Sequence, residues 1–139
     1  MTRHTTIGAI LLVLTAGCAK NNTTPTATVQ APPFQKARSL DGSFEGKVVG
    51  TPRSGGKFSK VRIGMSTKQV ADLIGQPNDT NTHITGKSFI PFFFGGDTHR
   101  TETFYRNEGQ LTFSPSHFAS GINVLIAIQV NPNESGYAH

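Results

Sequence analysis

The sequence predicts an α+β protein in which short helices pack on one face of a small antiparallel sheet of three to four strands. One capped amphipathic segment precedes several segments rich in aromatic and β-branched residues, a composition typical of strands. Turn signals separate these segments: RNEG predicts a hairpin turn with Gly109 in the positive-φ position, and GGD predicts a second tight turn. The strands are expected at residues 87–94, 100–106, 110–114 and 124–130.

The clearest local pattern predicts a helix at residues 67–74. Ser66 is a favoured N-cap, and Gln69 three residues later completes a capping box. Gly75 ends the helix and Pro77 prevents it from resuming. Two turns of helix are too short to persist alone, so the helix must dock an apolar stripe on the sheet. That stripe consists of Val70, Leu73 and Ile74, and a second short helix or turn is expected within KFSKVRIG just before it.

Residues 1–17 have the features of a lipoprotein signal peptide. Arg3 gives a positive start, and the apolar run at 7–14 is shorter than the about 20 residues that a membrane span needs. Ala16 and Gly17 precede Cys18, an order that resembles the lipobox of bacterial lipoproteins, although Leu14 lies one position early. The resemblance implies a covalent lipid on Cys18 and no other cofactor. An ordinary signal peptide with an unmodified Cys is the alternative.

The remaining chain divides by composition into a tether, a domain and a tail. Residues 18–56 are polar and interrupted by Gly and Pro, which predicts a lipidated flexible tether in which only Val48 and Val49 could join a sheet edge. Residues 57–131 form the predicted domain, and residues 132–139 an irregular tail. The segment from Lys36 to Arg62 is basic, with seven Lys and Arg against two acidic residues. This charge favours binding to anionic phospholipid, and a merely solvated linker is the alternative.

The predicted helix and the strands after it resemble the BamE (SmpA/OmlA) family of outer-membrane lipoproteins. The resemblance implies two helices against an antiparallel sheet, similar to β-lactamase-inhibitor proteins. It also implies an accessory role in the outer-membrane β-barrel assembly machine, with contacts to partner proteins and anionic phospholipid. The long tether and the extra segment KSFIPFFFGGDTHR leave open a paralogue with another partner. The matching residues are Gly64, Met65, Gln69, Val70, Leu73, Gly75, Pro77, Tyr105, Leu111, Thr112 and Phe113.

Side-chain alternation along the predicted strands defines two faces of the sheet. Tyr105, Leu111 and Phe113 are expected beneath the helices. The other face is expected to expose apolar side chains with Arg at the rim, a combination typical of protein interfaces. The predicted partner-binding residues are Phe89, Phe93, Phe104 and Leu125, with Arg100 and Arg106 at the rim beside Lys87. Cover by the tether, the tail or a second copy is the alternative.

Catalytic signals are weak, so the sequence predicts a non-enzymatic protein without a metal. His99 has Asp97 and Glu102 nearby, which is fewer than the three or four convergent ligands of a metal site, and no nucleophile-elbow or zinc motif is present.

Ala19 follows Cys18, where lipoproteins of the inner membrane often carry Asp, and the resemblance to that sorting pattern implies an outer-membrane lipoprotein on the periplasmic face. It would bind other envelope proteins, and no nucleic acid, as an accessory of β-barrel assembly and envelope integrity. The alternative is a periplasmic inhibitor-like or structural envelope lipoprotein with a different partner. A core of about 75 residues without disulfides is marginal, which leaves dimerisation open.

Overall fold

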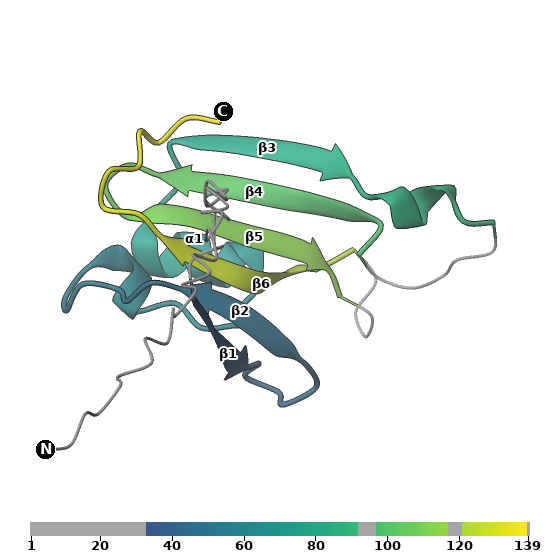
Figure 1. Ribbon diagram of the computed structural model, residues 1–139, viewed down its shortest axis with the longest axis horizontal. Coiled ribbons are helices and arrows are strands. Elements are labelled where there is room, and N and C mark those ends of the chain that lie inside the picture. Colours follow the sequence, from purple (N-terminus) through teal and green to yellow (C-terminus); the bar gives the residue numbers. More distant parts are fainter. Residues whose placement is uncertain (1–32, 92–96, 117–120, 139) are drawn as a thin grey trace, which may run out of the picture. The chain divides into compact units, whose positions relative to one another are not determined.

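A computed structural model describes residues 33–91, 97–116 and 121–138. In these ranges the chain forms a six-stranded sheet, a single α-helix and two short 3₁₀ turns (Figure 1). No helix among the described residues is long and apolar enough to cross a bilayer. The elements are β1 (Phe34–Arg38), β2 (Glu45–Val49), η1 (Lys57–Ser59), α1 (Thr67–Ile74), β3 (Asp79–Ile84), η2 (Gly86–Phe89), β4 (His99–Tyr105), β5 (Gly109–Pro115) and β6 (Asn123–Val130).

The sheet has the strand order β1-β2-β6-β5-β4-β3 and is mixed. Neighbouring strands are antiparallel except for β2 and β6, which run parallel and pair Lys47 with Ala127. Figure 1 shows the β1–β2 hairpin beside β6, and β3 at the opposite edge. The chain before α1 also pairs with β6: the Gly64 amide donates to the Leu125 carbonyl, and the Leu125 amide to the Met65 carbonyl.

The core lies between α1 with its preceding segment and one face of the sheet. Phe58 of η1 meets Tyr105 of β4 edge-to-face, with ring centroids 5.7 Å apart. Full burial of a large apolar side chain contributes about 1.5–3 kcal/mol, so this cluster supplies the main driving force for folding. Its members are Phe58, Val61, Ile63, Val70, Ile74, Tyr105, Leu111, Phe113, Leu125 and Ile128.

Local sequence signals were sufficient for α1 and for the β4–β5 turn. The structure confirms a helix at Thr67–Ile74 with both capping-box bonds: Ser66 Oγ accepts from the Gln69 amide at 3.2 Å, and Gln69 Oε1 accepts from the Ser66 amide at 2.8 Å. Gly109 has φ 129°, and a Cβ there would lie 2.0 Å from the Gln129 carbonyl oxygen. Only glycine fits this turn, as predicted.

The predicted fold class is wrong. The described residues contain one α-helix on a six-stranded mixed sheet, rather than two helices on three to four antiparallel strands. The expected second helix is the 3₁₀ turn η1. Three strands were missed, and β1 and β2 lie within the segment predicted to be a flexible tether. β1 is short and largely exposed, and β2, with the sequence EGKVV, buries only Gly46 and Val49. β3, with the sequence DTNTHI, is a polar edge strand, so none of the three shows the apolar alternation that sequence reading detects.

The predicted strand at 87–94 is also incorrect. Residues Gly86–Phe89 form the turn η2, and Phe92, Phe93 and Phe94 lie outside the described residues. The last three predicted strands are confirmed, since β4, β5 and β6 match them to within one residue at each end.

A β-bulge changes which side chains of β6 face the core. Leu111 pairs with Ile128 but Phe113 pairs with Leu125, so β6 has one extra residue between these two pairs. Strict alternation would place Leu125 and Ile128 on opposite faces, yet both are buried in the same core cluster.

The residues after β6 dock on the end of the sheet without regular structure. The Asn107 amide donates to the Glu134 carbonyl at 2.9 Å, and Arg106 Nε donates to the Ser135 carbonyl at 3.1 Å. The Ala138 amide donates to Asp79 Oδ2 at 3.0 Å, which ties the tail to the start of β3.

Candidate functional site

The strand registers place one row of side chains across the face of the sheet opposite α1, here called the distal face. Because Tyr105 and Leu111 face the core, their strand neighbours face the other way. From the β1 edge to the β3 edge this row consists of Lys36, Lys47, Ala127, Thr112, Glu102 and Asn81. The row is therefore positive at the hairpin, small in the middle and acidic on β4.

A cleft of about 740 Å³ opens on the hairpin half of the distal face. Its walls come from distant parts of the chain, since β1 and β2 line one side, while β5, β6 and the start of β4 line the other. Its volume is within the range of ligand-binding clefts, and its lining combines apolar surface with three acidic and three basic side chains. The apolar lining residues are Phe34, Phe44, Pro115, Val124, Ile126 and Ala127.

Cations stand at two places on the rim of the cleft. Lys47 Nζ lies 4.7 Å from the centroid of the Phe34 ring, a cation–π contact on the hairpin side. Arg100 lies on the opposite side and binds Asp97 twice, with Nε to Oδ1 at 2.8 Å and Nη2 to Oδ2 at 3.2 Å. Lys87 Nζ reaches Asp97 Oδ2 at 2.7 Å. These contacts, chiefly the hydrogen bond from Arg100, lower the pKa of Asp97 to about 2.

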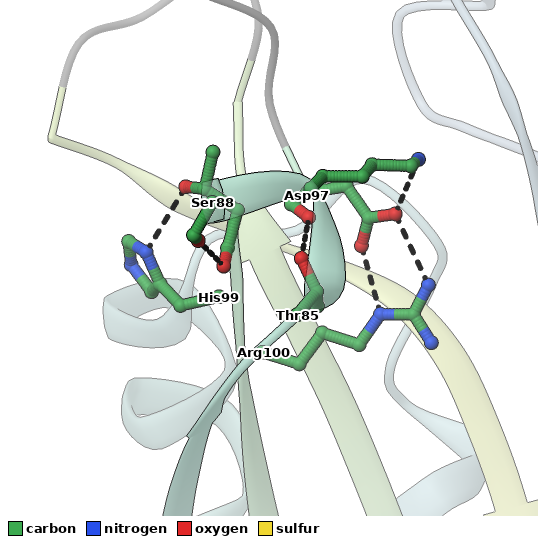
Figure 2. A network of polar contacts seen from close by, with 7 residues as sticks. Thr85, Ser88, Asp97, His99 and Arg100 are labelled. Carbon is green, nitrogen blue, oxygen red and sulfur yellow. Dashed lines mark hydrogen bonds and ion pairs between the residues drawn. The ribbon is translucent and has the colours of Figure 1, made fainter. Parts of the chain in front are cut away.

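Polar contacts hold the Asp97 side of the rim in place (Figure 2). Thr85 donates through its hydroxyl to the Asp97 carbonyl, and Ser88 donates likewise to the Thr98 carbonyl. The Thr98 hydroxyl lies 3.3 Å from His99 Nδ1. The turn η2 is therefore fixed to the start of β4, and Asp97 adopts φ 65°, which few residues other than Gly, Asn and Asp tolerate.

On the hairpin side, the turn between β1 and β2 is held by Asp41. Its Oδ1 accepts hydrogen bonds from Ser39 Oγ at 2.7 Å and Ser43 Oγ at 2.8 Å. These bonds, the one from Ser39 first, lower the pKa of Asp41 to about 2. The hairpin wall is thus ordered by its own side chains, and not only by its pairing with β6.

The structure does not bring the predicted partner-binding residues together. Phe89 is 79% exposed on η2, but Phe104 is only 4% exposed and Leu125 is fully buried in the core. Arg106 donates to the docked tail, away from the cleft. Phe93 and the lipidation residue Cys18 lie outside the described residues. The prediction of one exposed aromatic surface on these strands is therefore wrong.

Two physical reasons explain this error. The bulge turns Leu125 toward the core, and strand alternation cannot reveal a bulge. Phe104 does lie on the distal face as its position in the strand predicts, but alternation assigns a face and says nothing of burial. Of the predicted residues that the structure describes, only Arg100 lines the cleft.

Sequence reading missed the hairpin residues of the cleft, chiefly Phe34, Lys36 and Lys47. The only available signal was the apolar pair Val48 and Val49, expected at most to join a sheet edge. The structure instead places β2 between β1 and β6.

The described side chains form no group of three or more His, Cys, Asp or Glu that could hold a metal ion. In the same ranges every buried side-chain nitrogen or oxygen has a hydrogen-bond partner. The features of the cleft that could bind a ligand are thus its shape, its apolar surface and its paired charges.

Comparison of the chain with family models, with curated proteins and with solved structures found no match.

Proposed function

We propose that this protein is a non-enzymatic, lipid-anchored envelope protein whose distal-face cleft binds a segment of another envelope protein. The expected setting is the periplasmic face of the outer membrane, where it would act as an accessory of β-barrel assembly and envelope integrity. The lipobox-like sequence before Cys18 supports the anchor, and the helix motif shared with the BamE family supports the setting.

The observation that carries the binding role is the cleft itself. Its apolar lining suits the apolar side chains of a polypeptide, and Phe34, 52% exposed, is available to contact them. Lys47 is held over Phe34 beside the cleft, so a carboxylate on the bound segment would find a cation at the rim. The proposed partner is thus an apolar segment with an acidic residue opposite Lys47. Asp41, Glu45 and Asp97 also line the cleft and would disfavour further acidic residues.

The fold also favours a second candidate, an inhibitor-like or structural envelope lipoprotein with a different partner. The hairpin that forms one wall of the cleft belongs to a six-stranded mixed sheet, whereas the BamE resemblance implied a smaller antiparallel sheet. Because the hairpin wall is not part of the sheet that the resemblance implied, the binding surface differs too, and it could bind a different ligand. Anionic phospholipid is a further proposed ligand, because Lys57, Lys60 and Arg62 are exposed, and Arg62 lines the same hollow as Ala37 and Val48 of the hairpin.

Photo-crosslinking in cells tests the cleft and separates the two candidates. A crosslinking amino acid at Ile126 in the full chain should capture one protein. The same group at Lys68 on α1 serves as the control, because that side chain is exposed and does not line the cleft. Capture of a β-barrel assembly component supports the first candidate, and capture of a periplasmic enzyme or a wall-associated protein supports the second. Equal capture at Ile126 and Lys68 would contradict the cleft as the binding site.

The anchor is tested separately by metabolic labelling with palmitate. The full chain should incorporate label and fractionate with the outer membrane, and Cys18→Ser should lose both properties. An unlabelled wild-type chain would contradict lipidation while leaving the cleft experiment valid.

A further inference from the structure

The sheet ends at β3 with an edge that no other described strand covers. β3 pairs only with β4, and every β3 residue after Asp79 is exposed, including Ile84 at 66%. Among the described residues, the docked tail meets β3 at Asp79, through the Ala138 amide. The stretch from Thr80 to Ile84 is therefore an open strand edge.

The contacts between β3 and β4 show which β3 residues direct their backbone N–H and C=O groups toward β4 and which direct them outward. The Thr85 amide donates to the Thr98 carbonyl at 2.9 Å, so Thr85 and every second residue before it direct their backbone groups toward β4. Thr80, Thr82 and Ile84 direct theirs outward. The Thr80 amide is occupied by Asp79 Oδ1 at 2.8 Å, which leaves Thr82 and Ile84 as the outward donors.

The two edges of the sheet differ in their protection against pairing. Proteins commonly block an exposed edge with Lys, Pro or a bulge. β1 has Lys36 at its centre and Arg38 at its end, so pairing with its own copy would set Lys36 against Lys36. β3 contains no Lys, Arg or Pro, and its register with β4 is regular.

We propose that β3 pairs antiparallel with β3 of a second copy of this chain, with the two-fold axis at Thr82. In that register Thr82 faces Thr82, Thr80 faces Ile84, and Asn81 faces His83, so no like charges are opposed. β-branched side chains opposite one another stabilise an antiparallel pair. The contact covers the exposed Ile84 and joins the two sheets, while the clefts on the hairpin halves stay open.

Disulfide trapping in cells tests this pairing directly. Residues that face each other across antiparallel strands lie about 4.5–5.5 Å apart, within the range of a disulfide. Thr82→Cys in the full chain should therefore give a dimer on a non-reducing gel. Lys36→Cys at the centre of β1 is the matched edge control, and the unmodified chain, whose only cysteine is Cys18, gives the background.

A second variant tests the pairing without a disulfide. The Thr82 amide faces away from β4, so Thr82→Pro blocks the edge without breaking the sheet, and circular dichroism should be unchanged. The mass of the detergent-purified full chain in sedimentation should fall from dimer to monomer, whereas Thr82→Val should remain dimeric.

Three results would overturn the proposal: no more dimer from Thr82→Cys than from Lys36→Cys, a dimer that survives Thr82→Pro, or a mixed disulfide between Thr82→Cys and another protein. The last would assign the edge to a foreign strand. None of these results bears on the cleft, so the proposed function stands or falls separately.

Discussion

Tyr105 is the residue at which the three parts of the core meet. Its ring packs edge-to-face on Phe58 of η1, and Lys57 Nζ lies 5.5 Å from its centroid. Its hydroxyl donates to the Gly75 carbonyl at 3.2 Å, at the end of α1. One side chain of β4 therefore fixes both segments that cover the sheet. The sequence predicted its place beneath the helix, and the structure confirms it.

Replacement of Tyr105 by Phe should isolate the hydroxyl contribution. The variant keeps the ring contacts and loses the hydrogen bond to Gly75, which should lower the free energy of unfolding by about 1 kcal/mol. Urea denaturation measures this difference. Tyr137→Phe is the control, because its ring is 56% exposed, and its effect should stay within about 0.5 kcal/mol. Equal midpoints for Tyr105→Phe and wild type would contradict the structural role of this bond.

Burial of Tyr105 also predicts a loss of stability at alkaline pH. Desolvation raises the pKa of its phenol from 10.0 to about 12. Between these values the unfolded chain releases a proton that the folded chain keeps, so stability is complete below pH 10 and declines toward pH 12. Denaturation at a series of pH values should show a steeper decline for wild type than for Tyr105→Phe. Parallel declines would mean that other groups cause the alkaline unfolding.

At the scale of elements, the β1–β2 hairpin decides both the fold and the cleft. β2 packs closely because Gly46 has no side chain: a Cβ there would lie 2.6 Å from both the Ile126 carbonyl oxygen and Ile63 Cγ2. Ala37 and Val48 pack against the core from the same hairpin. The hairpin is therefore seated on the core through one face and lines the cleft with the other.

Gly46→Ala should displace this hairpin. The added methyl group meets backbone on one side and a buried side chain on the other, so overpacking should cost about 1–3 kcal/mol of stability. Thermal denaturation measures the cost. Gly86→Ala is the matched control, since a Cβ there meets nothing within 4 Å, and its midpoint should barely change. If Gly46→Ala were as stable as Gly86→Ala, the hairpin would not be seated as described.

The elements that the sequence predicted correctly are those specified by neighbouring residues. The cap, the buried residues Val70 and Ile74 and the terminating glycine of α1 all lie within Ser66–Gly75, and the β4–β5 hairpin is set by Gly109. Leu73 was predicted to share the apolar stripe, but it is 47% exposed, so that part of the prediction is wrong. β1, β2 and β3 were missed because their strand character depends on pairing with distant or polar partners. For the same reason the cleft could not be predicted: Lys47 meets Ala127 only through the parallel pairing.

At the scale of the whole molecule, the N-terminal hairpin and the C-terminal strand are neighbours. A parallel pair cannot be closed by a short turn, so β2 and β6 pair across a long connection that contains α1 and the strands β3, β4 and β5. The first described strand, β1, begins at Phe34, so the fold extends well upstream of the expected start at residue 57. Part of the segment expected to be a flexible tether therefore forms two strands of the folded sheet.

Two truncated chains test where the folded unit begins. A fragment of residues 57–139 lacks the hairpin, so β6 loses its pairing from Ala127 to Gln129 and the core loses Ala37, Phe44 and Val48. An uncovered central strand is an aggregation site, so this fragment should be unfolded or aggregated by circular dichroism and light scattering. A fragment of residues 33–139 keeps every described strand and should unfold cooperatively on heating. If residues 57–139 alone melted cooperatively at the same temperature, the hairpin would be dispensable, and the cleft that it walls would lose its rigid side.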